Sequence, residues 1–254
     1  MPLSSGTPVP PVRPAHPLWM ADGESRITVG IAATTWAACW VAGNLIGAAV
    51  LTASGREATD AADTPIWLTV LGALGLWIPT LVGLQLTSQR FGTRSVIRDY
   101  GLSFRRVDLV GIPIGVLTQL VLVRLLYWPL EAWWPETFSS PKVEESARTL
   151  YESADGLWLV GLVLLVVVGA PFVEELLYRG LLQSAFRRRV HDGVALVVVA
   201  LWFALIHFRP VEYPGLLVVG LVLGTCAIVT DRIGMSIVAH CAFNATGLIW
   251  VATR

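Results

Sequence analysis

Charge is scarce in this sequence of 254 residues. Only 14% of the residues are Asp, Glu, Lys or Arg, whereas 55% are hydrophobic and the mean hydropathy is +0.66. A soluble globular domain has about a quarter of its residues charged. The shortage of charge, together with long apolar runs, excludes an ordinary soluble domain and indicates an integral membrane protein.

Cysteine is rare too, and several short catalytic motifs are missing. The three cysteines (Cys39, Cys226 and Cys241) lie inside apolar runs and form no CxxC pair, so we interpret them as small buried hydrophobic residues. The sequence has no HExxH zinc motif and no GxSxG hydrolase elbow. The segment Gly234-Met-Ser-Ile237 lacks the final glycine of a GxSG serine loop, and the aspartates Asp192 and Asp231 stand only at span ends.

What the sequence has in abundance is apolar runs. They cover about Ile27–Thr52, Pro65–Thr87, Leu109–Leu130, Leu157–Leu177, Val194–Phe208, Pro214–Thr230 and Ile233–Val251. A membrane-spanning helix needs ~20 residues, so five runs are long enough and the fifth and sixth are short. We therefore predict an all-α polytopic transmembrane helical bundle of about seven spans. Residues 1–26, which hold six prolines, are predicted to be a disordered tail, followed by a three-span region (27–156) and a four-span region (157–254).

Basic residues predict the orientation of the spans. The loop after the second run carries Arg90, Arg94, Arg98, Arg105 and Arg106, and the segment after the fourth carries Arg187, Arg188 and Arg189, whereas the loop after the third run is acidic. Cytoplasmic loops are enriched in Lys and Arg. Both basic segments fall on the same side of the membrane if the N-terminus is cytoplasmic, which predicts a multi-pass protein of the cell membrane.

An ionisable side chain near the bilayer centre costs ~3 kcal/mol or more, so each one needs a reason. The residues of this kind, with one asparagine, are Arg124, Glu174, Glu175, Arg179, His207, His240 and Asn244. Glu175 and Arg179 are four residues apart and are predicted to form an ion pair on one helix face. Glu174 lies ~100° around that helix and has only Tyr178 at helical spacing, so its charged partner must come from another helix.

Depth along the helices brings these polar residues to one level. Glu174 is ~22 Å from Arg189, and His207 is ~21 Å into its helix, at 1.5 Å per residue. His240 and Asn244 share a face at i, i+4 and lie ~11 and ~17 Å from Ile233. We therefore predict that Glu174, His207, His240 and Asn244 line one intramembrane pocket. Each pattern alone is also typical of residues that merely hold helices together.

The three motifs Glu-Glu-x-x-Tyr-Arg-Gly, Phe-x-x-x-His and His-x-x-x-Asn, in this order, resemble those of the CPBP family (CAAX proteases and bacteriocin-processing enzymes, or Abi family), in its bacterial form. The resemblance covers about Leu157 to Val251. It implies an intramembrane endopeptidase with 157–254 as catalytic core, in which Glu174, His207, His240 and Asn244 are catalytic. Glu175, Arg179 and Tyr178 would then be supporting residues.

The chemistry of these residues allows a metal-free hydrolysis. Glu174 bonded to His207 can activate a water, while Asn244 and His240 can donate to the oxyanion. Glu174, His207 and His240 are also a zinc set, so zinc stays possible, although we favour no cofactor. The expected partners are the bilayer and a membrane-associated peptide or protein, with no nucleic acid. The substrate could be a prenylated C-terminus, a leader peptide or a membrane regulator. A proton-coupled or ion-coupled transporter using Arg124 and a non-catalytic scaffold are the alternatives.

Overall fold

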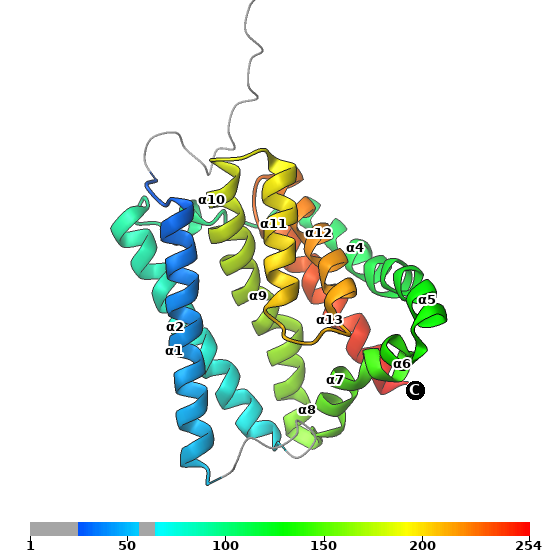
Figure 1. Cartoon of the computed structure of the whole chain (residues 1–254). Coiled ribbons are helices and arrows are strands. Elements are labelled where there is room, and N and C mark those ends of the chain that lie inside the picture. Colours follow the sequence, from blue (N-terminus) through cyan, green and yellow to red (C-terminus); the bar gives the residue numbers. More distant parts are fainter. Residues whose placement is uncertain (1–24, 56–63) are drawn as a thin grey trace, which may run out of the picture.

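The computed structural model describes residues 25–55 and 64–254. Nearly all of the predicted Pro-rich tail therefore lies outside the described residues. Within the described part there is no strand, and the chain forms a bundle of long helices joined by short links (Figure 1). The predicted all-α polytopic bundle is confirmed.

Among the residues that the structure describes, six helices are long and apolar enough to cross a membrane, and one apolar helix is shorter. The single-piece helices are α1 (Val29–Ala53), α2 (Ile66–Phe91), α11 (Asp192–Leu205), α12 (Tyr213–Thr230) and α13 (Gly234–Ala252). The third span consists of η2 (Arg106–Val110), α4 (Gly111–Leu117), η3 (Thr118–Leu122) and α5 (Val123–Trp133), and the fourth of α8 (Gly156–Val163), η4 (Leu164–Gly169), α9 (Ala170–Glu175), η5 (Leu176–Gln183) and α10 (Ser184–Arg187). The links contain α3 (Val96–Asp99), α6 (Pro135–Phe138) and α7 (Ser140–Glu152).

The lengths of α12 and α11 correct the expectation for the sixth apolar run and confirm that for the fifth. The sixth run was predicted to be short, but α12 has 18 residues and meets the length of a span. The fifth run is indeed short, because α11 has 14 residues and is only ~21 Å long, less than the ~30 Å hydrocarbon core. The fourth helix runs on without a break to Arg187, as the depth estimate for Glu174 required.

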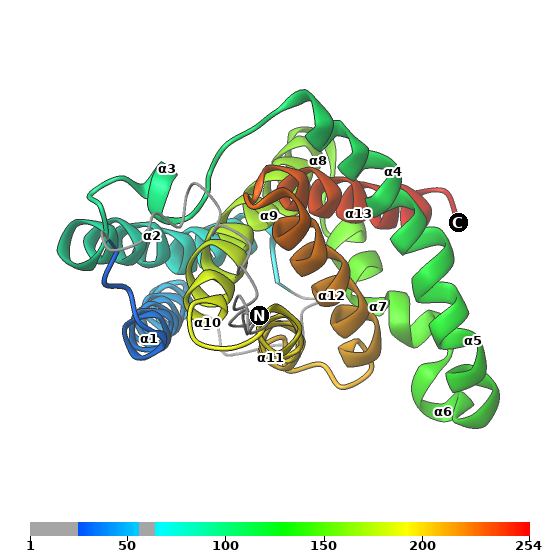
Figure 2. The ribbon, with the colours of Figure 1, turned by 90° about the horizontal axis from the view of Figure 1, so that it is seen from above.

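Glycines let the third span approach the last one closely. A Cβ on Gly111 would lie 2.7 Å from the carbonyl oxygen of Met235, and one on Gly115 would meet the backbone of Ala239 and Phe243. The segment Gly-Ile-Pro-Ile-Gly thus acts as the small-residue face of a GxxxG contact between α4 and α13. Seen from above, α4 runs beside α13, while α1 and α2 form a pair on the side of α8–α10 (Figure 2).

Two ends of the bundle can be distinguished in Figure 1. The basic end, which carries Arg187–Arg189 and the link around α3, lies where α10 ends and α11 begins. The opposite end, which we call the α7 end, carries α6, α7 and the last turn of α13. The long apolar helices make this a multi-pass membrane protein.

Candidate active site

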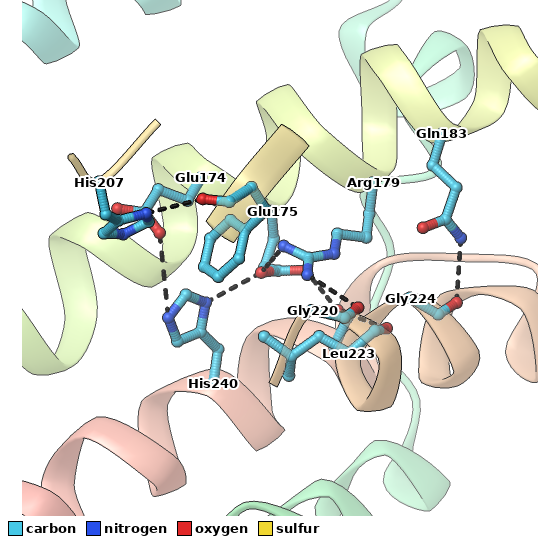
Figure 3. Close-up of polar contacts among 11 residues, drawn as sticks. Glu174, Glu175, Arg179, Gln183, His207, Gly220, Leu223, Gly224 and His240 are labelled. Atoms are coloured by element: carbon cyan, nitrogen blue, oxygen red, sulfur yellow. Dashed lines mark hydrogen bonds and ion pairs between the residues drawn. The ribbon is translucent and has the colours of Figure 1, made fainter. Parts of the chain in front are cut away.

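A fully buried ion pair lies at the centre of the site. Arg179 Nη1 donates to Glu175 Oε1 at 2.8 Å, and neither side chain is accessible to solvent. Arg179 Nη2 also donates to the carbonyl oxygen of Gly220 in α12, at 3.2 Å, and its guanidinium lies 4.8 Å from the ring centroid of Phe203. The ion pair predicted from the i, i+4 spacing is confirmed, and it also joins α9–η5 to α12 (Figure 3).

Glu175 in turn holds a histidine and a serine of α13. His240 Nδ1 lies 2.9 Å from Glu175 Oε1, and Ser236 Oγ donates to Glu175 Oε2. A carboxylate paired with arginine accepts hydrogen bonds, so Nδ1 of His240 carries a proton. The Nε2 of His240 is thereby turned away from Glu175. Glu175 thus fixes the orientation of the imidazole.

Glu174 faces the other side of the same histidine. Its Oε2 lies 3.9 Å from His240 Nε2, and 29% of its side chain is accessible, in contrast to the sealed Glu175. The sequence predicted a partner from another helix and proposed a bond to His207. The described residues show no direct hydrogen bond or ion pair between Glu174 and His207, and the imidazole that contacts Glu174 from another helix is that of His240.

Tyr178 does not serve Glu174 either. Its hydroxyl accepts a weak hydrogen bond of 3.5 Å from Trp36 Nε1 in α1, and its ring packs edge-on against Phe203. The i+4 spacing from Glu174 therefore does not lead to the expected hydrogen bond. Tyr178 instead ties the α1–α2 pair to the fourth span.

His207 lies in the turn immediately after α11 rather than inside the helix. Its Nδ1 is 2.7 Å from the carbonyl oxygen of Phe203. Because a carbonyl oxygen only accepts, Nδ1 must donate, and in the neutral imidazole Nε2 is then an acceptor. The ring of Phe203 touches both histidines, with centroids 4.9 Å from His207 and 6.1 Å from His240. Phe203 thus lies between the two histidines, and Glu174 faces one of them, His240 (Figure 3).

Asn244 is held apart from this group by a defect in the fourth span. In the π-helical segment η4, the N–H of Ala170 donates to the carbonyl of Leu165, and Pro171, next along the chain, has no N–H to offer. The carbonyl of Val166 is left without a helical donor, and Asn244 Nδ2 donates to it at 2.8 Å. Asn244 also lines a cavity of about 280 Å³ whose walls include none of Glu174, His207 and His240. The expectation that all four line one pocket is therefore not met by this cavity.

Two residues in the polar network were not predicted as part of the site. Ser236 stands four residues before His240, and Gln183 stands four residues after Arg179. Gln183 Nε2 donates to the carbonyl of Gly224, one turn beyond the Gly220 carbonyl that Arg179 binds. The i, i+4 spacing to a known member of each motif was the signal that could have found both.

The candidate zinc ligands do not form a metal centre. Among the described residues, no group of three or more His, Cys, Asp or Glu side chains is arranged to hold a metal ion. The Nδ1 atoms of both histidines bond to protein oxygens, and Glu174 contacts one of the two imidazoles.

The fold and the buried polar cluster define a class of protein: a multi-pass membrane protein with an ionisable site between its helices. A scan against family models gives the particular family, because residues 156–246 match the model described as Type II CAAX prenyl endopeptidase Rce1-like. This segment begins with α8, ends within α13 and contains all the candidate site residues. The segment is thus similar to that family of membrane proteases, and the predicted resemblance to the CPBP family is confirmed over these residues. No curated protein and no solved structure matches the chain.

Proposed function

We propose that the protein is an intramembrane endopeptidase in which Glu174 activates a water to hydrolyse a peptide bond of a membrane-associated substrate. The observation that carries the proposal is that the two adjacent glutamates lie in different environments. Glu175 is sealed and paired with Arg179, whereas Glu174 is partly accessible and faces His240. A base must reach a water, and only Glu174 can do so.

The tautomer of His207 supports this role for Glu174. With Nδ1–H donated to Phe203, the Nε2 of His207 can accept a hydrogen bond. A water between Glu174 and His207 would then donate one hydrogen to each and direct a lone pair at the peptide carbonyl carbon. Glu174 takes the proton during attack and returns it to the leaving amine nitrogen as the C–N bond breaks.

The developing oxyanion needs donors from the opposite side. Protonated His240 would supply an Nε2–H, and its positive charge, with that of Arg179, would balance the two carboxylates within the membrane. Asn244 uses one amide N–H on Val166, so its second N–H is the other donor we assign. Asn244 lines a cavity that does not include Glu174. For this donor to act, the bound substrate must therefore reach both the cavity at Asn244 and the Glu174 side chain.

The chemistry so described uses no metal, and this leads to a prediction. We expect the enzyme purified with a chelator, and shown by elemental analysis to contain no stoichiometric zinc, to retain full activity. The physical reason is that Glu174 can take the proton of a water without a metal, while Nε2 of His207 accepts the water's other hydrogen. Activity that is lost to a chelator and restored by zinc would contradict the metal-free scheme and leave the same residues at the site.

The experiment that tests the function begins in cells. Membrane proteomes of wild-type and Glu174→Ala cells should differ in a protein that accumulates uncut in the variant. The matching peptide should be cleaved by the purified wild-type protein and not by the variant. A prenylated C-terminus, a leader peptide and a membrane regulator are the substrate classes to be distinguished. Identical proteomes and no cleavage would favour a scaffold.

A transporter is the weaker alternative. Its proposed path joined Glu174 and His207 to Arg124, but Arg124 stacks on Trp250 and lines a cavity that includes neither of them. We also propose that the basic end is cytoplasmic, because Lys and Arg are enriched in cytoplasmic loops, which places the α7 end on the outer face of the cell membrane.

A further inference from the structure

Arg124 is the intramembrane charge that the proposed active site does not use. It lies in α5 between apolar residues, where an arginine at a helix centre costs ~2.5–3.5 kcal/mol. Its guanidinium carbon is 3.5 Å from the centroid of the Trp250 ring, and that of Arg254 is also 3.5 Å from this centroid. Two guanidinium groups at this distance cannot share one face of an indole. They therefore cover its two faces and form the Arg124–Trp250–Arg254 stack.

The stack carries two positive charges with which no described acidic side chain pairs directly. Within the described part of the chain, Arg124 and Arg254 form no ion pair or hydrogen bond. Two carboxylates line the same cavity as the stack. Glu144 accepts from Trp250 Nε1 at 2.9 Å and pairs with Arg148 at 3.4 Å, while Glu131 accepts from the backbone N–H and hydroxyl of Ser140.

The stack lines a cavity large enough for a polar head group. This cavity, of about 830 Å³, lies at the α7 end between α5, α6, α7 and α13. Tryptophans at helix ends mark a membrane interface, and Trp128, Trp133, Trp134 and Trp250 all lie at this end. Its wall on α5 includes Leu125 and Trp128, which are 61% and 77% exposed and so face the bilayer. The stack can therefore be reached from the lipid.

A second, more apolar space adjoins the first. The cavity at Asn244 shares Gln119, Val123, Tyr127 and Val143 with the larger one, and most of its remaining lining is apolar. A ligand that fits both spaces has an anionic head and an apolar chain. Guanidinium groups bind phosphate oxygens with paired N–H donors, and basic pockets between membrane helices bind anionic lipid heads.

We propose that the Arg124–Trp250–Arg254 stack binds the phosphate of an anionic phospholipid, with an acyl chain lying along the adjoining cavity. Lipid binding can be tested without a substrate, and the acyl chain would occupy the cavity at Asn244 that the proposed substrate also uses. Phosphatidylglycerol, a lipid with net negative charge, should bind more tightly than zwitterionic phosphatidylcholine, because the choline group would bring a further positive charge beside the two guanidinium groups.

The test uses the full chain purified in neutral detergent, with bound lipid counted by native mass spectrometry during titration. We expect Arg124→Gln to weaken phosphatidylglycerol binding about tenfold, which corresponds to about 1.4 kcal/mol. Arg106→Gln is the matched control, since Arg106 is also exposed and without an acidic partner among the described residues, but lies at the basic end. It should leave the binding unchanged.

If Arg124→Gln does not fold, Arg254→Gln removes the second cation, which lies just after α13, and should weaken binding several-fold. Equal binding by wild type and the folded variant would overturn the proposal, as would equal binding of the two lipids. Inorganic phosphate that competes as strongly as the lipid would identify a soluble anion as the ligand instead. Absence of lipid binding with loss of proteolysis in Arg124→Gln would assign the stack to the substrate.

Discussion

Glutamine in place of Glu174 should lower turnover by about 10²–10⁴-fold, the range that a general base contributes. Glutamine keeps the size of the side chain but cannot take a proton from water. The fold should survive, because Glu174 is 29% accessible and its only described polar contact is His240 at 3.9 Å. The measurement is the rate of cleavage of the peptide identified in cells, made beside a thermal melt of the same preparation.

Glu145→Gln is the matched control for Glu174→Gln. It removes one carboxylate from an exposed position on α7, where the side chain is 67% accessible and pairs with Arg209 at 3.4 Å. Its turnover and melting temperature should stay near those of wild type. Substantial turnover in a folded Glu174→Gln protein would contradict the base role and leave Glu174 as a residue of helix packing.

The sequence predicts the parts of the site that depend on spacing within one helix. Glu175 and Arg179 pair because residues four apart share a helix face, and this needs no knowledge of neighbouring helices. The long helices follow from apolar length alone, since a membrane span of ~20 residues leaves few other solutions. The motifs also located the segment, residues 156–246, that matches the family model.

Contacts between helices were harder to predict. The depth of a residue in the membrane does not give the rotation of its helix about the helix axis, and this rotation decides which neighbour the side chain faces. His207 and His240 were both placed near the level of Glu174, yet among the described contacts only His240 reaches that carboxylate directly, at 3.9 Å. His207 leaves the helical register at the end of α11 and bonds back to Phe203. The sequence thus predicted the depth of both histidines but not which of them contacts Glu174.

Asn244 shows a second limit, which comes from the geometry of the backbone. A straight helix of 3.6 residues per turn was assumed for the fourth span, whereas η4 and η5 are π-helical. Pro171 leaves the carbonyl of Val166 unpaired, and Asn244 satisfies it. Pro171 is visible in the sequence, so an orphan carbonyl four or five residues before it was predictable. Its partner was not, because it belongs to α13.

Arg179→Ala should destabilise the protein by about 3–5 kcal/mol, the cost of leaving a buried carboxylate without its cation. Glu175 has no accessible surface, so water cannot replace the guanidinium, and α12 would lose the hydrogen bond at Gly220. Activity should fall as well, because Glu175 orients His240. The measurement is the melting temperature in detergent together with cleavage of the peptide.

Arg148→Ala is the control for this loss. Its pair with Glu144 has the same i, i+4 spacing, but the two side chains are 37% and 26% accessible, and partly exposed pairs contribute ~0–1 kcal/mol. The same chemical change should therefore cost far less on α7 than in the core. Equal melting temperatures for wild type and Arg179→Ala would show that the buried pair does not hold the fold. Arg179→Ala that is less stable yet fully active at low temperature would separate the pair from the orientation of His240.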